Sequence, residues 1–111
     1  MRQNPELEIV MKHLIVDGML GGTGVRDVEN GGYVSLLELN ISAKLRKDIE
    51  IWLEDYANAH FFQFEDKEEI TKLDKCGINL AIRLQKELTN SNVEYFSNAF
   101  MKKVQLDGRP Y

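Results

Sequence analysis

Two long amphipathic segments constrain the fold of this chain more than any other feature. Residues 43–60 and 67–88 both carry apolar side chains at steps of three and four positions, the spacing of one helix face. The first stripe comprises Leu45, Ile49, Trp52, Leu53, Tyr56 and His60, and the second comprises Ile70, Leu73, Gly77, Leu80, Ala81, Leu84 and Leu88. Each helix must bury its stripe, so the rest of the chain has to supply an apolar layer.

The sequence also marks where these helices begin. Ser42 precedes the first helix and can accept a hydrogen bond from a free amide of its first turn. Asp66 and Glu69 have the spacing of a capping box before the second helix. Gly77 lies inside that helix, where glycine costs about 1 kcal/mol relative to alanine. We therefore expect Gly77 and Ala81 to leave room for the close approach of another backbone segment.

The remaining chain contains runs rich in β-branched and aromatic residues, which predict strands. These runs lie at residues 7–16, 25–28, 33–39 and 93–96. The first run is apolar on both faces near its end, which favours a central strand, and Asn30-Gly31 between the next two is a strong hairpin signal. The predicted fold is α+β, with an antiparallel or mixed sheet of about four strands and two helices packed on one face.

We expect residues 1–111 to form a single domain, because a chain of 111 residues is long enough to bury one core. Met11 can itself be a translation start, so residues 1–10 are interpreted as an N-terminal extension. Residues 101–111 are interpreted as a flexible tail that can add a further short strand. No apolar run has the length of a signal peptide or membrane helix, and the lone Cys76 cannot form an intrachain disulfide. The expected location is the cytoplasm.

The glycine-rich stretch at residues 17–33 raises the question of phosphate binding. A dinucleotide-binding fingerprint needs a glycine where Asp27 stands, and a phosphate-binding loop needs a lysine that the stretch lacks. Both motifs also need a helix directly after the loop, whereas a hairpin is predicted here. The acidic side chains of the stretch lack the spacing of a calcium loop as well. The sequence therefore predicts neither a nucleotide nor a metal site, and no cofactor.

The two histidines are candidates for acid–base chemistry. His13 lies in the first predicted strand, and His60 ends the first helix; neither has the spacing of a zinc ligand pair. His13 can pair with Glu94 or Asp17 if their strands adjoin, although a structural histidine is the favoured interpretation. Cys76 has no histidine nearby in the sequence to activate it, and we expect it to be a small, partly buried side chain.

Charge gives the clearest indication of a partner. The net charge is −4 and no basic stripe is present, which argues against direct nucleic-acid binding. Acidic side chains gather in the glycine-rich stretch and before the second helix. They are Asp17, Asp27 and Glu29 in the first group, and Glu65, Asp66, Glu68 and Glu69 in the second. Acids at a helix start stabilise the helix itself, but both groups are also candidate contacts for a basic protein partner.

The two helices and the last predicted strand resemble a group of small bacterial α/β proteins. The similarity lies in "LNISAKLRKDIEIWLEDYANA" (39–59) and "LDKCGINLAIRLQKELTNSNVEYF" (73–96). The residues that carry it are Ser42, Leu45, Trp52, Tyr56, Gly77, Leu80, Ala81, Leu84, Gln85, Glu87, Leu88, Val93, Tyr95 and Phe96. Such proteins resemble the immunity partners of contact-dependent growth-inhibition and other polymorphic toxins. The chain departs from the pattern in its glycine-rich insertion and at Ile51.

This resemblance implies a binding protein without catalytic activity. The expected function is that of an immunity protein, which neutralises the C-terminal domain of a cognate bacterial toxin, a nuclease, by covering its active site through an acidic surface. The complex is expected to be 1:1 with a monomeric inhibitor, without direct contact to nucleic acid or a membrane. Two alternatives remain open at this point. One is a small enzyme that uses His13 or His60 with a nearby carboxylate, and the other is a structural subunit that self-associates through Ile51 and "FFQF" (61–64).

Overall fold

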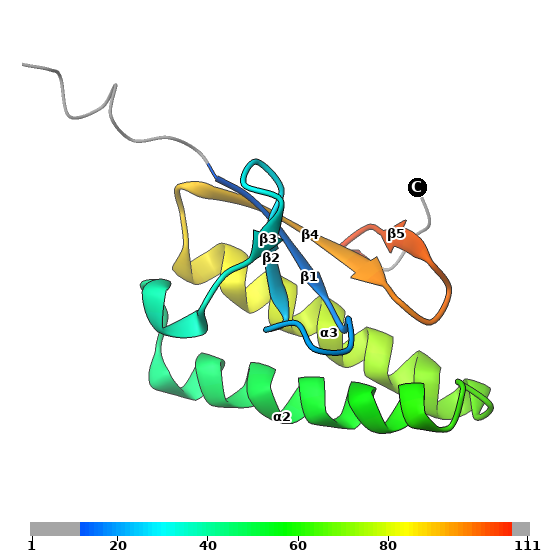
Figure 1. Ribbon diagram of the computed structural model, residues 1–111. Helices are drawn as coiled ribbons and strands as arrows, with labels where there is room; N and C mark the ends of the chain where they lie inside the picture. The colour runs from blue at the N-terminus through cyan, green and yellow to red at the C-terminus, as the bar shows by residue number, and fades with distance from the viewer. Residues whose placement is uncertain (1–11, 108–111) are drawn as a thin grey trace, which may run out of the picture.

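The computed structural model describes residues 12–107, which form one mixed sheet and a pair of helices. The elements in chain order are β1 (Lys12–Asp17), β2 (Val25–Asp27), β3 (Gly32–Tyr33), the 3₁₀ turn η1 (Leu36–Glu38), α2 (Ala43–Phe61), α3 (Lys67–Glu87), β4 (Ser91–Ser97) and β5 (Lys102–Val104). Both helices lie on the same side of the sheet (Figure 1). The predicted N-terminal extension, the first part of the first predicted strand and residues 108–111 lie outside the described residues.

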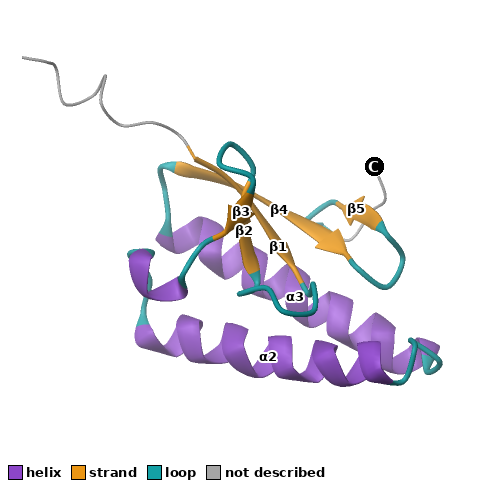
Figure 2. Ribbon diagram, in the orientation of Figure 1, coloured by secondary structure: helices purple, strands orange, loops and turns teal. Residues whose placement is uncertain are grey.

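The sheet has the strand order β3-β2-β1-β4-β5. Its central pair, β1 and β4, is parallel, and the other three pairs are antiparallel. The α+β class, the mixed sheet, the central position of β1 and the hairpin between β2 and β3 confirm the sequence predictions. The sheet has five strands rather than about four, because the expected tail contributes the edge strand β5 (Figure 2).

The predicted strand over residues 33–39 is wrong beyond its first residue. Strand β3 ends at Tyr33, and η1 follows it. Leu36 is 7% exposed and belongs to the core, whereas Leu37 beside it is 76% exposed. A strand would continue past the end of the three-residue β2, where it would have no partner. The tight turn instead directs one leucine inward and brings the chain to the start of α2.

Both helices begin where their capping residues predict. The Ser42 side chain accepts a hydrogen bond from the amide of Leu45 at 3.1 Å, and the Asp66 side chain accepts one from the amide of Glu69 at 3.1 Å. The last residues of α2 and α3 differ from the predicted ones by a single position. Local chemistry therefore determines these boundaries.

Gly77 is the point where helix α3 meets the aromatic core. A Cβ atom added at this glycine would lie 2.3 Å from the ring of Tyr95 and 2.8 Å from the ring of Trp52. The expectation of close packing is therefore right, but the approaching groups are aromatic side chains and not a backbone segment. Trp52 also donates a hydrogen bond from Nε1 to the carbonyl of Leu73 at 2.8 Å, which fixes α2 against α3.

A buried carboxylate joins both helices to the sheet. Asp74 on α3 accepts hydrogen bonds from the hydroxyls of Tyr56 at 2.9 Å, Tyr95 at 2.5 Å and Ser97 at 2.7 Å. Burial raises the pKa of Tyr56 to about 12, and the negative charge of Asp74 adds to this rise. Burial and the same charge also raise the pKa of Tyr95. Both phenols therefore stay protonated and act as donors at neutral pH.

Candidate functional site

A concave feature of the surface lies where α2 passes into α3, and we call it the end groove. It has a volume of about 460 Å³. The side chains that matter for its chemistry are Asp55, Phe62, Phe64, Glu65, Asp66 and Glu69. They come from the last turns of α2, the connection, and the first turn of α3. The end groove therefore combines carboxylates with aromatic rings.

The connection between the helices gives the end groove its shape. Gln63 and Phe64 both adopt left-handed backbone conformations, with φ of 55° and 56°. Such a conformation costs a non-glycine residue about 1 to 2 kcal/mol. Contacts hold it in place, because the amide of Phe64 donates to the carbonyl of Ala59 at 2.9 Å and the Phe64 ring packs 4.7 Å from that of His60. Phe64 thereby becomes the inner wall of the groove.

Three of the carboxylates have no partner within the part of the chain that the structure describes. The side chains of Asp55, Glu65 and Glu69 are exposed and make no hydrogen bond or ion pair with residues 12–107. Asp66 differs, because it caps α3. The end groove therefore presents negative charge that the described residues leave unneutralised.

Two phenylalanines stand beside these carboxylates with their rings in solvent. Phe61 is 79% exposed and Phe62 is 63% exposed, and their ring centroids are 5.1 Å apart in an edge-to-face arrangement. Adjacent exposed aromatic rings are a common feature of protein–protein contact sites. The "FFQF" segment is thus a surface feature at its first two rings and a core feature at Phe64.

The structure separates the predicted acidic residues before α3. Glu65, Asp66 and Glu69 share the end groove, where they are joined by Asp55, which the sequence analysis did not select. Glu68 lies elsewhere, beside Lys67, Lys72 and Lys75. Asp55 lies off the apolar stripe of α2, but only the turn back into α3 brings it to the other carboxylates.

The acids of the glycine-rich stretch are mostly internal. Asp17 is 2% exposed and accepts a hydrogen bond from the hydroxyl of Tyr33 at 2.6 Å, while Arg26 Nε lies 3.4 Å from its second oxygen. Burial raises the pKa of Tyr33, and its hydrogen bond to Asp17 adds to the rise. Asp17 is therefore a buried part of the sheet, and not an exposed acid of the glycine-rich stretch.

Asp27 is also internal, at 4% exposed. Its side chain accepts hydrogen bonds from the amides of Glu29 at 3.0 Å and Asn30 at 3.3 Å, and from the Asn30 side chain at 2.9 Å. Asp27 thus organises the β2–β3 turn. Only Glu29 of this group is exposed, and its carboxylate accepts a hydrogen bond from the amide of His13 at 3.2 Å.

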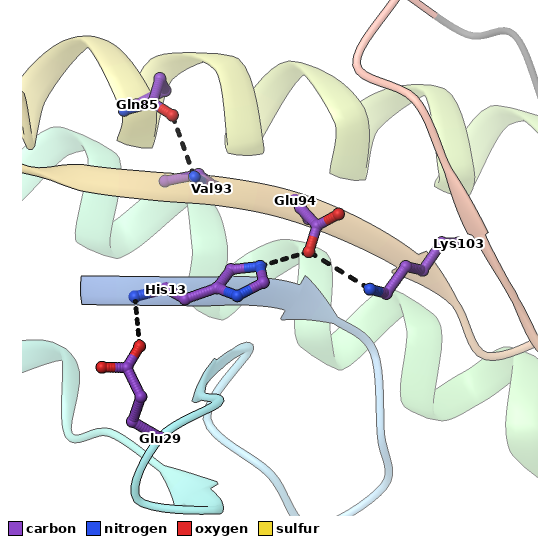
Figure 3. A network of polar contacts seen from close by, with 6 residues as sticks. All are labelled: His13, Glu29, Gln85, Val93, Glu94 and Lys103. Carbon is purple, nitrogen blue, oxygen red and sulfur yellow. Dashed lines mark hydrogen bonds and ion pairs between the residues drawn. The ribbon is translucent and has the colours of Figure 1, made fainter. Parts of the chain in front are cut away.

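His13 and Glu94 do form the pair that the sequence analysis considered. His13 Nε2 hydrogen-bonds Glu94 Oε1 across the β1–β4 ladder, and Lys103 Nζ lies 3.4 Å from the same oxygen (Figure 3). The side chains of His13 and Glu94 are 32% and 16% exposed. A carboxylate can orient an imidazole for acid–base work in this way. Neither residue lines the end groove.

Gln85 completes the polar contacts at the start of β4. Its Oε1 accepts a hydrogen bond from the amide of Val93 at 2.9 Å (Figure 3), and its Nε2 donates to the carbonyls of Leu88 and Ser91. One side chain thereby holds the connection from α3 to the central pair of strands. This is a structural role for a residue of the resemblance pattern.

The other histidine and the cysteine have simple surroundings. His60 Nε2 lies 2.9 Å from the carbonyl of Gly18, and its ring packs against Phe64. Cys76 is exposed, so the expectation of a partly buried thiol is wrong. Among residues 12–107 no three histidine, cysteine or acidic side chains are placed to hold a metal ion. No helix in this range combines the length and apolar character needed to cross a bilayer.

Comparison with protein-family models, with curated proteins and with solved structures found no match.

Proposed function

We propose that this protein is a cytoplasmic immunity protein, which binds the C-terminal domain of a cognate bacterial toxin and covers its active site. The observation that carries the proposal is the end groove, where three carboxylates that have no partner among residues 12–107 lie beside the exposed pair Phe61 and Phe62. The resemblance of both helices and β4 to immunity proteins of polymorphic toxin systems supports it. The partner surface that fits such a site is basic, as the substrate cleft of a nuclease is.

The inhibitory mechanism follows from the charges around the end groove. Carboxylates of Asp55, Glu65 and Glu69 take the places that nucleic-acid phosphates occupy in the toxin's cleft. Phe61 and Phe62 form the apolar centre of the contact and exclude water from it. Charge complementarity speeds the encounter with the toxin domain, and burial of the two rings slows dissociation.

The proposed contact surface differs from the two acidic groups that the sequence suggested. Asp17 and Asp27 are buried and serve the sheet, so we leave them out of the proposed contact. Glu29 binds the amide of His13 at the start of β1, whereas His60 beside the end groove contacts Gly18 just past the end of β1. Glu29 therefore belongs to the opposite end of that strand and is left out as well.

Protection of cells from the toxin domain tests this function. The proposal predicts a long reading frame upstream of the gene whose variable C-terminal domain is the toxin, and this domain is the one to test; absence of such a reading frame would contradict the proposal. Co-expression of the protein is expected to restore growth, and the purified pair is expected to elute as a 1:1 complex. The double variant Glu65→Gln/Glu69→Gln should lose protection, while Glu68→Gln, which changes a neighbouring residue outside the end groove, should retain it. Growth arrest despite normal levels of the wild-type protein would contradict the proposal.

The contact between His13 and Glu94 favours a second candidate, a small enzyme in which the oriented imidazole acts as a general base. The two functions differ in what His13 does. His13→Gln should abolish an enzymatic function but leave protection from the toxin unchanged, because His13 lies outside the end groove. Loss of protection in a folded His13→Gln protein would show that protection itself requires His13, which favours an enzymatic mechanism over a contact through the end groove.

A further inference from the structure

The end groove does not stop at its carboxylates but continues along the outer seam of the helix pair. A second pocket of about 310 Å³ lies between α2 and α3, and we call it the seam pocket. Ile51, Trp52, Leu73 and Leu80 supply most of its apolar wall. Asp55 lines both the end groove and the seam pocket, so the two hollows adjoin.

The two hollows differ in chemical character. Negative side chains approach the end groove from α2, from the connection and from α3, and among residues 12–107 no lysine or arginine lines it. The rings of Phe62 and Phe64 supply flat apolar walls beside these carboxylates. A guanidinium group suits such a chamber, because it binds carboxylates through paired hydrogen bonds and stacks on aromatic rings. An ammonium group makes the first kind of contact less well and has no flat face to stack.

The start of α3 would by itself oppose a cation, since the free amides of a helix start carry partial positive charge. Here the first turn is already compensated. The Asp66 carboxylate accepts a hydrogen bond from the Glu69 amide, and the Glu69 side chain adds a second negative charge to the same turn on the side of the end groove. The balance at the end groove is therefore negative.

Apolar side chains supply most of the lining of the seam pocket. Ile51 is 46% exposed although it is a large aliphatic residue, and it borders this pocket rather than open solvent alone. Asp55 lies where the seam pocket meets the end groove, and the other two charged residues at the rim, Asp48 and Arg83, pair with each other at 2.9 Å. Because these charges are mutually satisfied, the seam pocket offers an incoming side chain mainly apolar surface.

Resting on the proposed function, we infer that the toxin domain is recognised through an extended segment that carries an arginine and, two positions away, an apolar side chain. The arginine enters the end groove between the carboxylates and the rings of Phe62 and Phe64. The apolar side chain enters the seam pocket against Ile51. Side chains two positions apart in an extended chain point the same way, which matches two adjoining hollows on one face.

Titration of the isotope-labelled protein with short peptides, followed by NMR, tests this inference without the toxin. The probe is N-acetyl-Arg-Gly-Leu-amide. The first control replaces arginine with citrulline, which keeps the shape but removes the charge, and the second replaces leucine with glycine. We expect the probe to shift the amide signals of residues around both hollows. The citrulline peptide should bind about 5-fold more weakly, which corresponds to the upper range for an exposed ion pair.

Matched variants assign the two ends of the peptide. Glu65→Gln/Glu69→Gln should lower the affinity for the probe as much as the replacement of arginine by citrulline does, whereas Glu68→Gln should leave this affinity unchanged. Ile51→Ser should remove the difference between the leucine and glycine peptides. Equal affinity for the arginine and citrulline peptides, or shifts scattered outside the two hollows, would overturn the inference. If the protein neutralises the toxin and loses this activity in Glu65→Gln/Glu69→Gln but does not bind the peptide, only this inference is refuted. If the protein binds the peptide specifically but does not neutralise the toxin, only the proposed function is refuted.

Discussion

The hydroxyl of Tyr95 on β4 donates a 2.5 Å hydrogen bond to the buried carboxylate of Asp74 on α3. Tyr95→Phe should therefore lower the free energy of unfolding by about 1 to 3 kcal/mol, since it deprives a buried charged acceptor of a donor. Urea unfolding measures this loss, which should appear as a lower midpoint with an unchanged slope. Combining Tyr95→Phe with Asp74→Asn should give less than the sum of the two single losses. Strict additivity would show that the bond contributes nothing.

Alkaline pH should destabilise the fold through its tyrosines. Burial raises the pKa of Tyr56 to about 12, and the pKa values of Tyr33 and Tyr95 are raised as well. Their unfolded pKa is near 10, so unfolding releases protons only above that pH. The stabilisation is complete below about pH 10 and is lost as the pH rises towards 12, at about 1.4 kcal/mol per pH unit for each of the two fully buried tyrosines, Tyr56 and Tyr95. Denaturant unfolding at several pH values between about 9 and 12 measures how steeply the free energy of unfolding falls with pH. Tyr56→Phe should make this fall less steep.

Gly77→Ala should destabilise the protein although alanine is the better helix former. The added methyl group meets the rings of Tyr95 and Trp52 inside their contact distance. Overpacking of this kind costs about 1 to 3 kcal/mol, which exceeds the gain of about 1 kcal/mol in helix propensity. Thermal unfolding measures the balance. Cys76→Ala changes the adjacent, exposed residue of the same helix and should be nearly neutral; a Gly77→Ala protein with a higher Tm than this control would contradict the packing argument.

Asp27→Ala separates a structural acid from a binding acid. It removes the acceptor that organises the β2–β3 turn, so we expect a loss of about 1 to 3 kcal/mol in the free energy of unfolding. Affinity for the toxin domain should not change at temperatures where the variant is folded. Calorimetric titration against that domain measures the affinity. Glu69→Gln is the contrasting variant, for which we expect weaker binding and unchanged stability. Weakened binding by a fully folded Asp27→Ala protein would return the turn to the contact surface.

Phe62→Ser should affect binding and leave stability unchanged. The Phe62 ring is 63% exposed, so its removal from the free protein should change the free energy of unfolding by no more than about 0.5 kcal/mol. Its loss from the complex should weaken binding by about 2 kcal/mol or more, as for other aromatic anchors. Gel filtration over a range of concentrations adds a check, because a monomer is expected at all of them. A concentration-dependent size that Phe62→Ser abolishes would favour the self-associating subunit instead.

The parts of the fold that the sequence predicts well are those decided by local chemistry. The spacing of Ile49, Trp52 and Tyr56 indicates one helix face, and Ser42 marks where that helix starts, so α2 could be placed within a residue. The run at 33–39 has no such local determinant. Its conformation depends on where its antiparallel partner β2 begins, at Val25, and on the space that the core leaves for Leu36.

The candidate site was predictable only in part, and for the same reason. Glu65, Asp66 and Glu69 stand out in the sequence as an acidic group, but helix geometry turns Glu68 away from them. Asp55 joins the group because the chain turns back at Gln63 and Phe64, which both adopt left-handed conformations. Neither residue is glycine, so the sequence does not indicate this turn. Burial of Asp17 likewise depends on Tyr33, which lies 16 positions away and reaches it only across the sheet.

The parallel pairing at the middle of the sheet has a consequence for how the protein is made. The side chains of His13 on β1 and Glu94 on β4 form a hydrogen bond, yet the two residues are 81 positions apart in the chain. During synthesis, β1 leaves the ribosome early and has only its short antiparallel neighbour to pair with until both helices and β4 have emerged. Pairings between distant segments are slow to form and leave strand edges open in the meantime. A chain that stops before β4 therefore lacks the centre of its sheet. If the proposed immunity function holds, protection begins only once translation of this protein is nearly finished.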